Sequence, residues 1–195
     1  MSIPWEIKRF FELFPGQTLL IKGRAGTGKT ILSLEILKEI CDERNGLYLS
    51  TRINPEKLYS LFPWVTSVVP EKNIVNATPS KLLKAIGSTG SSRDQIFDFG
   101  SALNFFKTVY EDVEEMDNPV MVIDSWNALL DCLRISDQGA ALTQSLCEFA
   151  HEVGTHLIFI SETDSQSVLD YIVDGVVTLR DIEIHGESMG GTGVF

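Results

Sequence analysis

The chain alternates short apolar runs with longer segments in which apolar residues recur at helical spacing. Uninterrupted apolar runs are typical of strands that are buried on both faces of a parallel sheet. Strands are predicted at residues 19–22, 46–50, 74–77, 119–125, 156–161 and 175–179. Helices are predicted at residues 30–43, from Pro55, from Pro79, and at 94–115, 137–153 and 165–172. Repeated strand-then-helix units predict an α/β fold, with a mostly parallel twisted β-sheet and helices on both faces.

The two ends of the chain are predicted to be appendages of one domain that spans residues 1–195. Residues 1–15 include an amphipathic segment, which is either a lid packed on the sheet edge or an arm that docks on a neighbouring subunit. Residues 186–195 are predicted to be a flexible C-terminal tail, after residues 182–185 that would pair with the last strand as a hairpin. The small polar residues 87–92 indicate a loop within the domain.

One turn between a predicted strand and helix carries the strongest chemical signal in the chain. It has the form G-x-x-x-x-G-K-[ST] and lies between a strand and a helix, as a phosphate-binding loop requires. Glycines let successive backbone N–H groups turn inward around a phosphate, and the helix N-terminus adds partial positive charge. Lys29 is predicted to reach the β- and γ-phosphates, and the Thr30 hydroxyl to bind Mg²⁺. The predicted nucleotide-binding residues are Gly23, Arg24, Ala25, Gly26, Thr27, Gly28, Lys29, Thr30 and Ile31.

A second landmark is the apolar run that ends at Asp124. A buried parallel strand delivers the residue at its carboxyl end to the edge of the sheet where ligands bind in open α/β folds. Downstream of a phosphate loop, this pattern is typical of a Walker B strand. Asp124 is therefore predicted to hold the Mg²⁺ that Thr30 also contacts.

Composition and charge narrow the classes of partner. The formal net charge is -11, so the averaged surface repels polyanions, which disfavours nucleic acid without excluding a local basic loop. No apolar run approaches the length of a membrane span, and the first residues lack the apolar core of a signal peptide. The three cysteines form no C-x-x-C pair and are interpreted as reduced core thiols. A cytoplasmic protein is expected, with its three histidines in structural or surface roles.

Several short motifs resemble one superfamily. They are Phe14-Pro15-Gly16-Gln17, Tyr48-Leu49-Ser50-Thr51, Val122-Ile123-Asp124-Ser125 and Asp174-Gly175-Val176-Val177. Together with the phosphate loop they resemble the RecA/RadA/KaiC superfamily of P-loop ATPases, over about residues 14–180. Residues 50–58 and 62–64 are most similar to archaeal KaiC-like and gas-vesicle regulator GvpD-like members. The resemblance implies a RecA-like core, ATP and Mg²⁺ as ligands, and a ring or filament in which ATP lies between subunits.

The chain departs from the superfamily pattern at the expected catalytic base. Relatives carry a glutamate just after the strand that follows the phosphate-loop helix, whereas this chain has Arg52 and Ile53 there. Arg52 is a candidate to contact phosphate or a neighbouring subunit. Glu56 and Glu162 are candidates to replace the base, beside Lys29 and Asp124 as catalytic residues. A general base typically supplies about two to four powers of ten in rate, so its loss without replacement would make hydrolysis slow.

Two further departures concern partners. Relatives often continue after the last strand with a basic segment that reaches the neighbour's ATP, but here only Arg180 supplies nearby positive charge. The loops that bind DNA in recombinases offer Arg134 alone among acidic residues. A recombinase paralogue that binds single-stranded DNA is therefore the least favoured function.

The sequence favours an Mg-dependent ATP-binding domain with slow hydrolysis that acts as a regulatory or assembly module. A non-hydrolysing, nucleotide-dependent interaction protein is the alternative, because Arg52 replaces the usual glutamate. The partner is expected to be a second copy of the chain, in a ring or nucleotide-dependent assembly, or another protein. No base-specific motif excludes GTP, so ATP is preferred through the family resemblance alone.

Overall fold

The computed structural model describes residues 3–41, 45–76, 106, 119–133 and 135–181. The helices predicted from Pro79 and at 94–115, the loop at 87–92 and the segments at 182–185 and 186–195 lie outside the described residues, except for Phe106.

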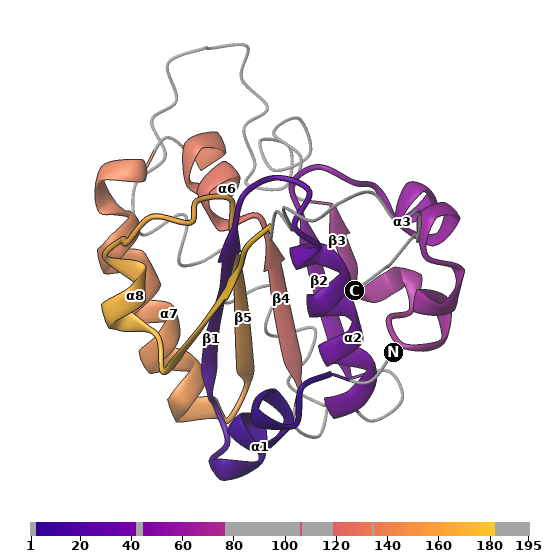
Figure 1. Ribbon diagram of the computed structural model, residues 1–195, viewed down its shortest axis with the longest axis horizontal. Helices are drawn as coiled ribbons and strands as arrows, with labels where there is room; N and C mark the ends of the chain where they lie inside the picture. The colour runs from indigo at the N-terminus through magenta and orange to yellow at the C-terminus, as the bar shows by residue number, and fades with distance from the viewer. Residues whose placement is uncertain (1–2, 42–44, 77–105, 107–118, 134, 182–195) are drawn as a thin grey trace, which may run out of the picture.

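The centre of the described structure is a parallel sheet of six strands in the order β3-β2-β4-β5-β1-β6 (Figure 1). The strands are β1 (Thr18–Gly23), β2 (Gly46–Ser50), β3 (Ile74–Asn76), β4 (Val120–Asp124), β5 (His156–Ser161) and β6 (Gly175–Leu179). Each coincides with a strand that the apolar runs predict, within two residues at either end. The prediction of an α/β fold is confirmed, and every strand pair in the described sheet is parallel.

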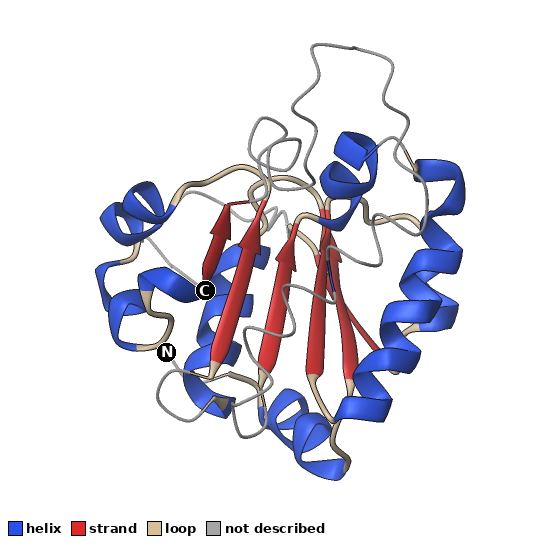
Figure 2. Cartoon of the chain, turned by 180° about the vertical axis from the view of Figure 1, so that it is seen from behind, coloured by secondary structure: helices blue, strands red, loops and turns tan. Residues whose placement is uncertain are grey.

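Helices cover both faces of the sheet (Figures 1 and 2). The α-helices are α1 (Trp5–Leu13), α2 (Lys29–Ile40), α3 (Pro55–Leu61), α6 (Trp126–Leu133), α7 (Gly139–Val153) and α8 (Leu169–Ile172). The described residues also form three short 3-10 helices, η1 (Pro63–Ser67), η2 (Glu71–Asn73) and η3 (Ser136–Gln138). Apolar residues of α1, α2 and α3 pack with one face of the sheet, and those of α6, α7 and α8 pack with the other.

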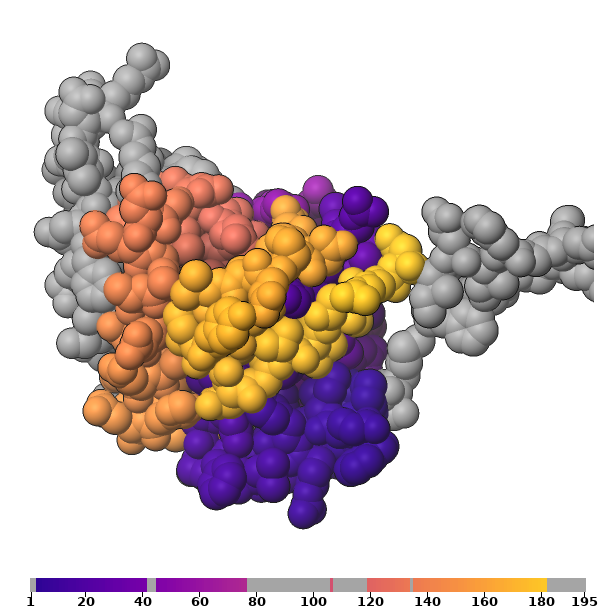
Figure 3. Space-filling model, turned by 60° about the vertical axis from the view of Figure 1, so that its left-hand side comes forward, coloured from indigo at the N-terminus to yellow at the C-terminus, as the bar shows by residue number. Residues whose placement is uncertain are grey.

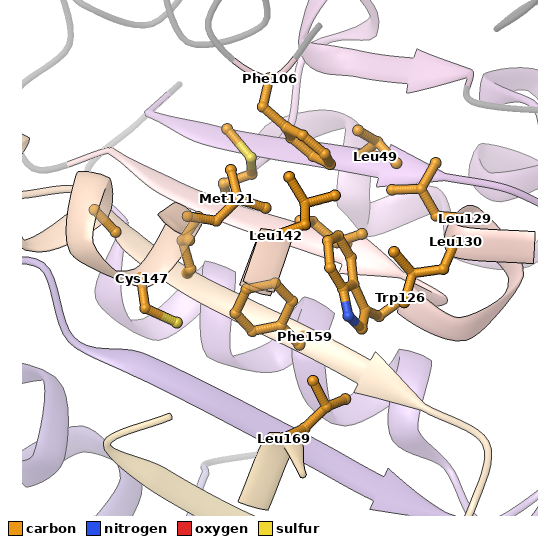
Figure 4. Packing of buried hydrophobic residues seen from close by; sticks show 14 of the residues in the cluster. Leu49, Phe106, Met121, Trp126, Leu129, Leu130, Leu142, Cys147, Phe159 and Leu169 are labelled. Carbon is orange, nitrogen blue, oxygen red and sulfur yellow. The ribbon is translucent and has the colours of Figure 1, made fainter. Parts of the chain in front are cut away.

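Two hydrophobic cores result from the alternation of side chains along each strand. In β1, Leu19 and Ile21 belong to the core on the side of α2, whereas Leu20 belongs to the core on the side of α7. Figure 4 shows the second core, in which the Trp126 ring lies edge-on to Phe159 with ring centroids 5.1 Å apart. Each face of the sheet is therefore closed by its own layer of helices.

The helix before the first strand is packed against the rest of the chain at the end of the sheet opposite the carboxyl ends of the strands (Figure 1). Ile7 and Phe11 of α1 are buried in the core on the side of α2. Trp5 and Leu13 of α1 and Phe14, directly after the helix, remain exposed. Within the described residues, no helix combines the length and the apolar character needed to cross a bilayer.

The helix predicted at 165–172 is shorter in the structure, where α8 begins at Leu169. Hydroxyl side chains in the preceding segment make local hydrogen bonds instead of helical ones. The Ser165 N–H donates to Thr163 Oγ1 at 3.1 Å, and Ser167 Oγ donates to Asp170 Oδ1 at 3.0 Å. Such bonds compete with the helical backbone ladder, which explains why the helix starts late.

A buried ion pair connects α8 to β1, the strand next to β6 at one edge of the described sheet; Figure 3 shows this side of the molecule, with the segment from α8 to β6 in front. Lys22 is the last residue of β1 before Gly23, and its Nζ pairs with Asp170 and donates to the Ser165 carbonyl at 3.3 Å. Burial alone would raise the pKa of Asp170, but the hydrogen bonds and charge of Lys22, with a bond from Ser167, hold that pKa below its usual value. The pair therefore connects the strand that leads into the phosphate loop to the segment after β5.

The carboxylate of Asp174 accepts hydrogen bonds from the opposite end of β1, at Thr18. Asp174 Oδ2 accepts bonds from the Thr18 N–H at 2.8 Å, Thr18 Oγ1 at 2.7 Å and His151 Nε2 at 2.9 Å. Partial burial would raise the pKa of Asp174, but the bonds from His151 and Thr18 outweigh it and lower that pKa. His156 is buried, which lowers its pKa, and its Nδ1 accepts a bond from the Gln17 N–H. The structural role expected for the histidines fits the contacts of His151 and His156, and His185 lies outside the described residues.

We expect the fold to lose stability in acid because of these two aspartates. A carboxyl group whose folded pKa lies below its unfolded value of about 3.9 adds stability that is present above about pH 4 and is lost as the pH falls through the folded pKa. Urea unfolding at about pH 6 and about pH 3 measures the loss, and Asp174→Asn should reduce the difference between the two free energies. The exposed Asp181→Asn variant is the control. If the free energy of unfolding depended on pH in the same way in both variants, Asp174 would not be a source of the acid instability.

The three cysteines are free thiols, with Cys147 buried and Cys41 and Cys132 half-buried. Burial raises the pKa of Cys147 to about 11, so the thiol is protonated at neutral pH. Among the described residues, no group of three or more histidine, cysteine or acidic side chains is placed to hold a metal ion.

Candidate nucleotide site

The predicted phosphate loop connects β1 to α2 at the carboxyl edge of the sheet. Gly23, Gly26 and Gly28 have φ values of 155°, 87° and 90°, which side chains rarely adopt. A Cβ at Gly23 would lie 2.4 Å from the Leu179 carbonyl oxygen, so the loop passes directly against β6. A Cβ at Gly26 or Gly28 would meet no atom within 4 Å. The loop is thus tight against β6 at Gly23 and unobstructed at the Cβ positions of Gly26 and Gly28.

Lys29 lies along the loop with its charge close to the backbone. Its Nζ donates to the Gly23 carbonyl at 2.7 Å and the Arg24 carbonyl at 2.6 Å, and the residue is 7% exposed. The Thr27 hydroxyl also donates to the Arg24 carbonyl, at 2.9 Å. Because Lys29 is the first residue of α2, its ammonium and the helix N-terminus place positive charge at one point.

The structure brings Thr30 and Asp124 into direct contact. Thr30 Oγ1 donates to Asp124 Oδ2 at 2.8 Å, although the two residues are 94 positions apart. Thr30 is in the first turn of α2 and Asp124 is the last residue of β4. A hydroxyl and a carboxylate are oxygen ligands of the kind that Mg²⁺ prefers, so the donor set fits the predicted metal.

Tyr48 is a member of this cluster that the sequence analysis did not identify. Its hydroxyl donates to Asp124 Oδ2 at 2.6 Å, from a side chain that is fully buried in β2. Burial, followed by the negative charge of Asp124, raises the pKa of Tyr48 well above its usual value, so the hydroxyl remains a donor. A tyrosine inside an otherwise apolar strand was the available signal, since a buried hydroxyl needs a partner.

Arg52 and Glu162 are also brought together. The guanidinium of Arg52 contacts both carboxylate oxygens of Glu162, which is a bidentate ion pair between the loops after β2 and β5. Arg24 of the phosphate loop lies near Asp164 of the same segment, with 3.8 Å between Nε and Oδ2. Two cations of the predicted site thus face carboxylates that follow β5.

Glu56 and Ile31 occupy the margins of the site. Glu56 is exposed in the first turn of α3, and within the described residues its carboxylate accepts one side-chain hydrogen bond, from Asn54 Nδ2 at 3.1 Å. Ile31 is 46% exposed on α2, directly after Thr30. The structure therefore does not join Glu56 to the loop, Thr30 or Asp124.

Comparison with known proteins places the chain in a family. The family model described as "GvpD gas vesicle protein, P-loop domain" matches residues 7–192. Protein GvpD2 of Halobacterium salinarum is 32% identical over 185 residues, which cover 91% of this chain and 36% of that protein. Protein GvpD1 of the same organism is 28% identical over 183 residues, with 91% of this chain and 33% of that protein covered. The chain thus spans about a third of the length of these relatives.

A solved structure shows the same fold. The crystal structure of a KaiC-like protein from the hyperthermophilic archaeon Pyrococcus horikoshii OT3 matches with a TM-score of 0.58 and 18% identity, over 91% of this chain and 77% of that one. A match at 18% identity shows similarity of fold alone, and it confirms the predicted RecA-like core. With the family match over residues 7–192, the resemblance expected from the motifs is also confirmed, and the chain belongs to the family of GvpD P-loop domains.

Proposed function

We propose that the chain is an Mg-dependent ATP-binding module with slow hydrolysis, which acts in regulation or assembly. The observation that carries the proposal is the 2.8 Å contact between Thr30 and Asp124, directly after the predicted phosphate loop in α2. Two side chains that the sequence assigns to one metal ion are already in hydrogen-bond contact at the carboxyl edge of a RecA-like sheet. That edge is where ligands bind in open α/β folds.

Each residue of the site has a defined part in this proposal. The backbone N–H groups of residues 26–30 and the N-terminus of α2 would bind phosphate oxygens. Lys29 would exchange its loop carbonyls for the β- and γ-phosphates, while Thr30 and Asp124 would hold Mg²⁺. The bound Mg²⁺ would neutralise charge that develops on the phosphates. Tyr48 would keep the Asp124 carboxylate oriented through its own hydrogen bond.

Slow hydrolysis is supported by the state of the candidate bases. Both carboxylate oxygens of Glu162 contact Arg52, and among the described residues no hydrogen bond or ion pair joins Glu162 to the phosphate loop, Thr30 or Asp124. Glu56 contacts Asn54 and no residue of the phosphate loop among those described. The same observations favour the second candidate, a non-hydrolysing module that changes its interactions when nucleotide binds.

A role in regulation or assembly is supported by the family and by the surface. The relatives are gas vesicle proteins in the family description, and the structural neighbour is KaiC-like. Trp5 and Phe14 are 70% and 67% exposed, and large exposed apolar side chains are common anchors of protein interfaces. We propose a second copy of the chain or another protein as the partner, because a net charge of -11 disfavours nucleic acid.

A single-turnover assay tests this function and separates its two versions. With protein in excess over labelled ATP, we expect slow release of phosphate that stops when Mg²⁺ is chelated and is lost in Asp124→Asn. The variant removes the negative charge that would hold the metal while it preserves the size of the side chain. Asp137→Asn, at an exposed site in η3, is the matched control and should release phosphate at the wild-type rate.

Retention of intact ATP by the wild type over many hours would instead establish the non-hydrolysing module. Phosphate release that persists unchanged in Asp124→Asn would remove Asp124 from the proposed metal site.

A further inference from the structure

The Arg52–Glu162 ion pair crosses the sheet directly beyond the end of β4. In the sheet, β4 lies between β2 and β5, and Asp124 is in register with Ser50 on one side and Ile160 on the other. Arg52 and Glu162 each lie two residues past those register partners. The ion pair therefore joins the two loops that flank the strand end carrying Asp124, the proposed metal ligand.

The backbone that carries Arg52 is held firmly at this edge. The Thr51 N–H donates to the Asp124 carbonyl at 2.8 Å, and the Ser125 N–H donates to Thr51 Oγ1 at 3.2 Å. Ser50 Oγ accepts bonds from the backbone N–H groups of Arg52, at 3.3 Å, and Ile53, at 2.9 Å. The backbone at Arg52 is thus anchored by hydrogen bonds, whereas its side chain is exposed to solvent.

The pair differs in exposure from the other close ion pair of this region. The side chains of Arg52 and Glu162 are 53% and 35% exposed, whereas those of Lys22 and Asp170 are 7% and 14% exposed. An exposed ion pair contributes little net stability, because water solvates both partners when they separate. Arg52 can therefore exchange one anion for another, while Lys22 cannot do so without unfavourable burial of an unpaired charge.

The strand order indicates which anion would reach Arg52. The phosphate loop follows β1, and the proposed metal ligand Asp124 ends β4, so a phosphate chain held by both would extend from β1 toward β4. Arg52 enters from β2, on the far side of β4 from β1. The outermost phosphate of such a chain is the one within its reach, and a guanidinium binds phosphate through two parallel hydrogen bonds.

We infer that Arg52 is the residue that distinguishes a nucleoside triphosphate from a diphosphate, and that Glu162 holds Arg52 over Asp124 until a γ-phosphate displaces it. The inference rests on the proposed function, since it requires phosphate to bind in the loop. Glu162 is a positioning residue in this arrangement. It lowers the affinity for triphosphate, because the two anions compete for one guanidinium.

Equilibrium titration with ADP and with a non-hydrolysable ATP analogue, both with Mg²⁺, tests the inference. In Arg52→Ala we expect the affinity for the analogue to fall about tenfold and the affinity for ADP to change less than about twofold. In Glu162→Gln we expect the affinity for the analogue to rise a few-fold with ADP unchanged, because the competing anion is gone. Lys8→Ala, an exposed lysine of α1 at the opposite end of the sheet, is the control for the loss of one positive charge.

The outcomes separate the inference from the proposed function. Equal effects of Arg52→Ala on ADP and on the analogue, or no effect on either, would overturn the inference while nucleotide binding stands. Weaker binding of the analogue by Glu162→Gln would also overturn it, since the glutamate would then assist the triphosphate. Failure of the wild type to bind either nucleotide would overturn the proposed function itself.

Discussion

Replacement of Lys29 by alanine is expected to weaken ATP binding about 100-fold, because truncation of a buried charged partner typically costs about 2–5 kcal/mol. Lys29 is nearly buried and already lies on the loop, with its ammonium 2.6 to 2.7 Å from two loop carbonyls. A bound phosphate would therefore lie close to the Lys29 ammonium, within the loop and at the N-terminus of α2. Truncation leaves the helix dipole and the backbone N–H groups without the ammonium that lies against the loop.

Calorimetric titration with Mg-ATP measures the loss directly. Lys38→Ala is the matched control, because Lys38 is in the last turn of the same helix and is half-exposed beside Glu35. We expect the control to bind ATP as the wild type does. Wild-type affinity in Lys29→Ala would exclude the loop as the nucleotide site, whatever the affinity of the control.

Replacement of Trp126 by alanine is expected to lower the free energy of unfolding by about 3–5 kcal/mol, the usual range for a buried aromatic residue. Trp126 is fully buried at the start of α6, between Phe159 and Phe106, with ring centroids 5.1 and 5.9 Å away (Figure 4). Its Nε1 has no hydrogen-bond partner among the described residues, so the loss is that of packing and of buried apolar surface. The cavity would open beside the strand end that carries Asp124.

Urea unfolding followed by circular dichroism gives this free energy, and the chain offers a control of the same residue type. Trp5 is 70% exposed on α1, and Trp5→Ala should change the stability by less than about 0.5 kcal/mol. Equal losses of unfolding free energy in the two variants would contradict the expected contribution of buried Trp126 to the core on the side of α7.

The strands and the phosphate loop could be predicted because their signals are local. Each strand is a short apolar run, and the loop is a contiguous motif, so neither requires knowledge of distant partners. The pairing of Arg52 with Glu162 could not be predicted in this way, because it depends on the strand order that sets β2 and β5 on either side of β4. The sequence predicted a contact with phosphate or a neighbouring subunit for Arg52 and a catalytic role for Glu162, and it did not predict that the two side chains pair.

Buried polar contacts were the other part that local patterns do not reveal. Tyr48 and Lys22 lie in runs that predict strands, and only the packed structure shows that they reach Asp124 and Asp170. The late start of α8 has the same origin, since the hydroxyl groups of residues 163–167 find partners that hydrophobic spacing does not encode.

The sheet separates two hydrophobic cores, and Asp124 lies at the end of β4, between residues of both. Its carboxylate is held by Tyr48, whose ring belongs to the core on the side of α2, while Trp126, two residues further on, belongs to the other core. A ligand bound by this carboxylate would therefore be linked, through the hydrogen bond of Tyr48, to the core on the side of α2.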